Sequence, residues 1–124
     1  MFLLDTHVLL WWLADDPSLS PKARVLISDE KALVFVSAAS AWEIVVKKAL
    51  GKLEAPDDLE IALKENNFKE LPITIRHALA IGHLPNYHQD PFDHMLVAQA
   101  QCESLTLITA DKKLLQYDIA YVKT

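Results

Sequence analysis

A short apolar segment that runs straight into an acidic residue opens the chain. Phe2 to Leu4 are apolar, Asp5 and Thr6 interrupt, and Val8 to Leu13 are apolar again. This pattern predicts a buried strand that ends at Asp5 and a helix that begins just after it. In an open α/β sheet, such turns lie at the carboxyl ends of the strands, where ligands bind. Asp5 is therefore either a helix cap, for which Asp is a favoured residue, or part of a functional site.

Strand-like and helix-like patterns alternate along the rest of the 124 residues. Alternation of this kind implies a parallel sheet with helices on both faces. We therefore predict an α/β fold, a three-layer α/β/α sandwich around a mainly parallel sheet, formed by residues 1–124 as one domain. Further strands are expected at 33–36, 68–73, 105–108 and 119–122. Helices are expected at 21–28, 59–64, 75–81 and 91–102, with a long helix that ends at Leu50 and is capped by Ser37 or Ser40, and a short helix starting at Asp111.

Composition excludes several classes of protein. Only two glycines are present, and the chain has neither a phosphate-binding P-loop nor a dinucleotide-binding glycine motif. The single cysteine, Cys102, rules out an internal disulfide and a thiolate zinc cluster. We find no signal peptide and no membrane-spanning run, so a cytoplasmic protein without membrane contact is expected. The net charge of −5 disfavours non-specific adhesion to nucleic acid, but not a nucleic-acid enzyme that holds cations at its active site.

Two further acidic segments repeat the logic of the first. Asp111 follows the strand expected at 105–108, while Asp90 and Asp93 flank the start of the helix that begins at Pro91. Capping explains Asp90 and Asp111, and the helix dipole favours an acid at Asp93 by roughly 0.3–1 kcal/mol. On one parallel sheet, however, all of these turns point to the same edge.

Glu43 has the weakest structural explanation. It is the only charged residue between Lys31 and Lys47, inside a dense apolar segment. One interpretation is an exposed pair with Lys47 one helical turn away, worth roughly 0.2–0.5 kcal/mol. We favour the other, a functional carboxylate, because a poorly solvated carboxylate needs a cation or a proton.

Convergence of four carboxylates, those of Asp5, Glu43, Asp93 and Asp111, would cause strong repulsion that hard divalent cations relieve. Mg²⁺ and Mn²⁺ prefer oxygen ligands and can support hydrolysis of a phosphodiester. Zinc is not supported, because no histidine pair has ligand spacing. We interpret His7 and His94 as polar neighbours of the site and His83 and His88 as loop residues. The lysines beside the acids, at 47, 48, 112 and 113, either contact phosphates or lie on solvated helix faces.

These motifs together resemble the PIN-domain ribonucleases, and most closely the VapC-like toxins of toxin–antitoxin systems. The segments that carry the resemblance span the chain in order: Leu3 to Trp11 (LLDTHVLLW), Ser40 to Ile44 (SAWEI) with Lys47, Asp90 to Ala100 (DPFDHMLVAQA), and Thr109 to Asp111 (TAD). The resemblance implies a Mg²⁺- or Mn²⁺-dependent endoribonuclease that acts on structured RNA and is held inactive by a cognate antitoxin.

The resemblance also assigns residues. It places the acids that hold the metal and perform catalysis on Asp5, Glu43, Asp93 and Asp111. It gives auxiliary roles to a further set: Thr6, Asp90, Thr109 and Lys47. His94 departs from the family pattern, since many relatives carry Arg there, so the resemblance does not extend to a phosphate contact at this position, although it still covers the four acids.

Alternatives from other classes remain open at this point. A receiver-type signalling module fits the length and the α/β pattern but requires adjacent acids after the first strand, where this chain has Asp5 followed by Thr6 and His7. A phosphatase would have a second Asp at position 7, and a non-catalytic α/β binding domain leaves Glu43 unexplained. Acetyl phosphate labelling would support the receiver, and Mn²⁺-dependent RNA cleavage the nuclease.

The first helix suggests a partner surface. Its segment Val8 to Leu13, which includes Trp11 and Trp12, is apolar all round. Such a helix either lies deep in the core or presents one face to another chain. We expect a homodimer or a toxin–antitoxin hetero-oligomer, with an antitoxin helix or strand in an adjacent groove.

Overall fold

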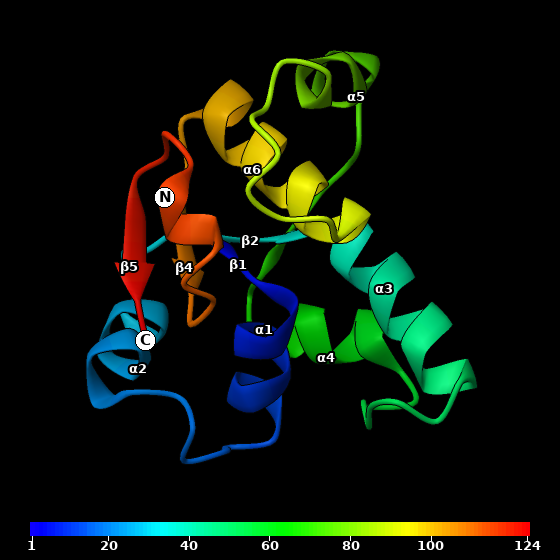
Figure 1. Cartoon of the computed structure of the whole chain (residues 1–124). Coiled ribbons are helices and arrows are strands. Elements are labelled where there is room, and N and C mark those ends of the chain that lie inside the picture. The colour runs from blue at the N-terminus through cyan, green and yellow to red at the C-terminus, as the bar shows by residue number, and fades with distance from the viewer.

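The computed structural model describes residues 1–124 and contains a five-stranded sheet flanked by helices (Figure 1). The strands are β1 Phe2–Leu4, β2 Val34–Ser37, β3 Lys69–Leu71, β4 Thr106–Thr109 and β5 Tyr121–Lys123. The helices are α1 Thr6–Leu13, α2 Pro21–Ser28, α3 Ala38–Ala49, α4 Leu59–Glu65, α5 Ile75–Ile81 and α6 Pro91–Glu103, with a 3₁₀ helix at Leu114–Gln116.

All strands of the sheet are parallel, and β1 lies at its centre. The order is β3-β2-β1-β4-β5, and Phe2 of β1 pairs with Val34 on one side and Thr106 on the other. The chain leaves β1 toward β2 but leaves β4 toward β5, in the opposite direction. The connections therefore diverge between β1 and β4, which is where open α/β sheets form a crevice at the carboxyl ends of their strands.

Helices cover both faces of the sheet, which confirms the predicted three-layer sandwich. Successive residues of β1 point to opposite faces. Leu4 packs with Val8 of α1 and Ala23 of α2, whereas Leu3 packs with Leu96 of α6. Figure 1 shows the two outer layers, with α1, α2 and α4 on one side of the sheet and α5 and α6 on the other.

Local capping chemistry explains why the elements begin where the sequence predicted. Ser20 caps α2, Ser37 caps α3 and Thr74 caps α5, each by accepting a backbone N–H in the first turn. Gly51 follows α3 with a φ of 69°, a conformation that glycine adopts without strain.

Two predicted boundaries were too generous. The strand expected at 68–73 covers only Lys69–Leu71, because Pro72 lacks an N–H to continue the ladder. The helix expected to begin at Asp111 is a 3₁₀ turn over Leu114–Gln116. No helix in the structure combines the length and the apolar character needed to cross a membrane.

The first helix uses its apolar residues largely against the core. Val8 and Leu9 are fully buried, and Trp11 and Trp12 are half-buried and pack on the same cluster. The indole N–H of Trp12 also donates to Asn66 Oδ1 at 2.9 Å. Of the two interpretations of this helix, the core therefore accounts for most of its apolar surface, and the largest exposed apolar side chains lie on other elements.

Candidate active site

A cleft of about 350 Å³ lies at the carboxyl ends of the strands and collects acidic residues from distant parts of the chain. All four predicted carboxylates line it, together with two of the predicted auxiliary residues, Asp90 and Lys47. The lining residues are Asp5, His7, Trp11, Glu43, Lys47, His88, Asp90, Asp93, Ala110 and Asp111. The expected convergence at one sheet edge is therefore present.

Asp5 stands at the N-cap position of α1 but makes no side-chain cap hydrogen bond. Its Oδ2 accepts a hydrogen bond from Thr109 Oγ1 at 2.6 Å, so the carboxylate turns toward the end of β4. Burial raises the pKa of Asp5, with smaller raising contributions from Glu43 and Asp111, while the Thr109 hydroxyl and His7 act to lower it. The capping interpretation is therefore wrong for Asp5, and its carboxylate forms no salt bridge with a lysine or arginine.

Glu43 is only 2% exposed, although it does form the predicted pair with Lys47. Thr6 Oγ1 donates to Glu43 Oε1 at 2.6 Å, and the Lys47 ammonium binds the other oxygen. The hydrogen bond to Glu43 is the main cause of the raised pKa of Lys47, which also lies 3.7 Å from Asp90 Oδ2. The Glu43–Lys47 pair therefore lines the cleft and does not lie on a fully exposed helix face.

Asp90 caps a helix, whereas Asp93 contributes its carboxylate to the cleft. Asp90 caps α6 by accepting the N–H groups of Phe92 at 2.9 Å and Asp93 at 3.4 Å. Asp93 lies in the first turn, is 8% exposed and points into the cleft. Burial, followed by the negative charges of Asp5, Asp90 and Glu43, raises the pKa of Asp93 to about 8. Without a cation, Asp93 therefore holds a proton in much of the population at neutral pH.

Asp111 combines a local turn with a place in the cleft. Its Oδ1 accepts the backbone N–H of Lys113 at 2.9 Å, and its own N–H donates to Thr109 Oγ1 at 3.0 Å. Its Oδ2 lies 2.9 Å from His88 Nε2. Thr109 consequently contacts both acids at this end of β4.

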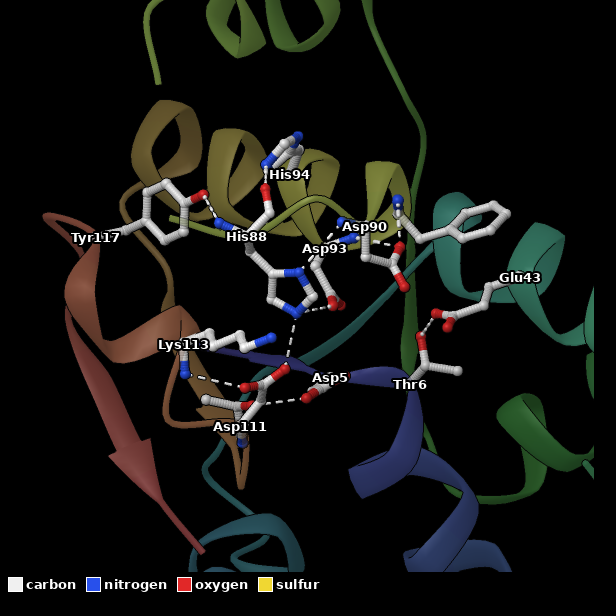
Figure 2. Close-up of polar contacts among 12 residues, drawn as sticks. Asp5, Thr6, Glu43, His88, Asp90, Asp93, His94, Asp111, Lys113 and Tyr117 are labelled. Atoms are coloured by element: carbon white, nitrogen blue, oxygen red, sulfur yellow. Dashed lines mark hydrogen bonds and ion pairs between the residues drawn. The ribbon is translucent and has the colours of Figure 1, made fainter. Parts of the chain in front are cut away.

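His88 was wrongly interpreted as an ordinary loop residue. Figure 2 shows its ring between Asp93 and Asp111, where Nε2 lies 3.0 Å from Asp93 Oδ2 and 2.9 Å from Asp111 Oδ2. The signal available in the sequence was its position two residues before the cap, Asp90, because that spacing lets the ring fold back onto the helix start. His88, Asp93 and Asp111 form the one group of potential ligands whose donor atoms all lie within 4.8 Å of one another.

The remaining histidines lie around the site or away from it. His7 is exposed on the cleft wall beside Trp11, and His94 contacts the His88 carbonyl, so both are polar neighbours of the site. His83 is exposed in its loop, as predicted. His77 is buried and completes the capping box of α5.

The donor set suits a hard divalent cation. Four carboxylates face one cleft, Lys47 is the only lysine or arginine in its lining, and the pKa values of Asp5 and Asp93 are raised partly by neighbouring negative charges. Carboxylate oxygen ligands fit Mg²⁺ or Mn²⁺, and the cleft provides no thiolate for softer metals. A cation bound here would relieve the repulsion that burial creates.

Comparison with known families decides what kind of domain carries this cleft. The sequence profile described as the PIN domain matches residues 2–120. The chain belongs to the PIN domain family. PIN domains are nucleases, so the family resemblance seen in the sequence is confirmed, and the receiver and phosphatase interpretations are set aside.

Solved structures share the fold of this PIN domain at low sequence identity. A chain in the crystal structure of VapBC2 from Rickettsia felis bound to a DNA fragment from their promoter matches with a TM-score of 0.73 and 13% identity, over 99% of this chain and 98% of that one. FitAcB from Neisseria gonorrhoeae matches with a TM-score of 0.67 and 21% identity, over 99% of this chain and 97% of that one. DNA-bound VapBC from Salmonella typhimurium matches with a TM-score of 0.69 and 16% identity, over 98% of this chain and 96% of that one. No curated protein matches the sequence.

Proposed function

We propose that this PIN domain is a metal-dependent endoribonuclease and the toxin component of a toxin–antitoxin system. The observation that carries the nuclease proposal is the single cleft in which Asp5, Glu43, Asp93 and Asp111 meet at the switch point of a parallel sheet. The toxin role is supported by fold similarity to VapBC and FitAcB structures over nearly the whole of each chain.

The four acids would hold Mg²⁺ or Mn²⁺, while the hydroxyls of Thr109 and Thr6 keep Asp5 and Glu43 in place. When bound, the cation supplies positive charge at the scissile phosphate and lowers the pKa of water. Lys47 compensates Glu43 and limits the negative charge that an RNA phosphate meets. Water attacks phosphorus, the bond to the 3′ oxygen breaks, and that oxygen takes up a proton. The products carry 5′-phosphate and 3′-hydroxyl ends.

The proposed reaction is tested with purified protein and total RNA, incubated with Mg²⁺, Mn²⁺ or excess EDTA, followed by mapping of new ends. We expect cleavage only with the divalent ion, and none by the Asp111→Asn variant purified in parallel as the control for contaminating nucleases. Equal cutting in EDTA would contradict metal dependence. Ends bearing a 2′,3′-cyclic phosphate would show attack by the RNA's own hydroxyl instead of water.

An antitoxin is the protein partner that we propose. A second cleft, of about 580 Å³, lies between α3, α4 and the ends of β2 and β3, and more than half of its lining residues are hydrophobic. Val45 and Leu59 belong to this apolar groove, and Val45 is 66% exposed. An amphipathic helix or an extended segment that places apolar side chains in such a groove would bury them.

A homodimer is also proposed, but through a different surface from the first helix. Ile75 and Leu79 are the most exposed large apolar residues of α5, at 79% and 69%, whereas Trp11 and Trp12 are half-buried and pack against the core. Exposed apolar side chains of this size favour an interface between copies. Sedimentation at tens of micromolar concentration separates the dimer from a monomer.

A further inference from the structure

His88 is held inside the acidic cleft although it is not one of the four acids. We propose that His88 is a positioning residue of the nuclease: its Nε2, which is hydrogen-bonded to Asp111 and in contact with Asp93, sets the spacing of these two carboxylates for the divalent cation. The inference rests on the proposed function, since it assigns a role within the same metal site.

The His88 residue is fixed from several sides. Its Nδ1 accepts the backbone N–H of Asp90 at 3.1 Å, and its own backbone N–H donates to the hydroxyl of Tyr117 at 3.1 Å. Its carbonyl contacts the ring of His94. Figure 2 shows these contacts meeting around the segment that leads into α6. Because the backbone and the Nδ1 edge of the ring are both held, Nε2 points into the cleft.

The contact with Asp90 also fixes where the ring carries its proton. A nitrogen that accepts a hydrogen bond from a backbone N–H bears no proton, so the proton of the neutral ring lies on Nε2. Nε2–H then donates to Asp111 Oδ2 at 2.9 Å, and Asp93 Oδ2 lies 3.0 Å from the same nitrogen. Because one anchored nitrogen contacts both carboxylates, it holds them at a defined separation.

This arrangement argues against two other roles for the ring. A ligand at Nε2 would need its proton on Nδ1, where the N–H of Asp90 already points. A side chain that only blocked the cation site would not need a ring held by the Asp90 N–H and a backbone held by Tyr117. A donor that orients two metal-binding carboxylates is the kind of outer contact whose loss weakens metal affinity, typically about 10–100-fold.

The test measures Mn²⁺ binding to the intact protein by electron paramagnetic resonance, without RNA. We compare the parent with His88→Ala, His88→Gln and, as a matched loop control, His83→Ala, and confirm folding by circular dichroism. Gln carries an N–H donor the same number of bonds from its Cα as Nε2 of His. We expect about 10–100-fold weaker binding for His88→Ala, binding within a few-fold of the parent for His88→Gln, and no change for the control. If His88→Ala does not fold, His88→Phe, which keeps a ring without a donor, takes its place.

Several outcomes would overturn the proposal. Unchanged or tighter Mn²⁺ binding by His88→Ala means that the ring does not position the acids, or that it blocks the ion. A hyperfine coupling between Mn²⁺ and an imidazole nitrogen, lost in His88→Gln, would make His88 a ligand instead. Asp93→Asn separates the two levels of inference. If that variant loses Mn²⁺ and His88→Ala does not, only the role of His88 fails; if the parent itself binds no Mn²⁺, the proposed metal site fails with it.

Discussion

Replacing Asp93 by Asn should stabilise the metal-free protein, and the gain should depend on pH. The pKa of Asp93 is raised from 3.8 to about 8, first by burial and then by the acids around it. The folded state therefore binds more protons than the unfolded state between these two values. Stability linked to Asp93 is fully present below pH 3.8 and is lost as the pH rises toward 8. The Asn side chain removes this loss because it never ionises.

The magnitude follows from the size of the shift. Each pKa unit corresponds to about 1.4 kcal/mol, so a shift from 3.8 to about 8 sets an upper limit of roughly 6 kcal/mol above pH 8. Neighbouring acids share the repulsion and relax when one charge is removed, so we expect about 1–3 kcal/mol for the variant at pH 8. In a chain of 124 residues, this raises Tm by roughly 3–5 °C per kcal/mol.

Thermal melts in EDTA at pH 5 and pH 8.5 measure the difference between parent and variant. We expect the full gain at pH 8.5 and only about a quarter to a third of it at pH 5, because the folded carboxyl is protonated there while the unfolded one is already ionised. Asp118→Asn, at an exposed carboxylate outside the cleft, is the matched control and should leave Tm unchanged at both values. Added Mg²⁺ should reverse the order, because an ion at 100 times its Kd stabilises the parent by about 2.7 kcal/mol. A variant that is less stable at pH 8.5, or equally stabilised at both pH values, would refute the reasoning.

Two other substitutions test the auxiliary residues and the partner groove. Thr109→Val removes the hydroxyl that donates to the buried carboxylate of Asp5. We expect the free energy of unfolding, measured in urea, to fall by about 1–3 kcal/mol. Thr106→Val, at a half-exposed position on the same strand, is the control and should change it little. Val45→Glu places a charge in the apolar groove and should abolish antitoxin binding by calorimetry without loss of nuclease activity. Val25→Glu, at a valine of similar exposure (69% against 66%) on α2, should bind normally, and equal binding by both variants would exclude the groove.

Much of the fold was predictable because apolar runs alternate with capping residues. Ser20, Ser37 and Thr74 each mark a helix start in the sequence and cap that helix in the structure. The strand before Asp5 and the strand before Asp111 were visible as short apolar runs. The convergence of their ends followed from the parallel sheet alone, since parallel strands bring their carboxyl ends to one edge.

The remaining features of the site depend on how the loop from Gly82 to Asp90 folds, which no periodicity encodes. That loop returns His88 to the cleft, where its contacts come from residues 23 positions away, at Asp111, and 29 away, at Tyr117. Likewise, the pairing of Glu43 with Lys47 was visible as a helical spacing, but its burial depends on what packs over α3. Long-range packing decided both cases.

The four acids of this PIN domain are not equivalent, and the structure explains why. Glu43 has Lys47 as a counter-charge, and Asp111 is one-third exposed and bonded to a backbone N–H, so water and the turn stabilise its charge. Asp5 and Asp93 have no lysine or arginine partner and are almost fully buried, and burial raises the pKa values of both. They follow β1 and begin α6, on either side of the crevice that the sheet order creates. The unrelieved negative charge is therefore concentrated where the fold leaves room for a ligand, so the same residues that weaken the empty fold would give a divalent cation its affinity.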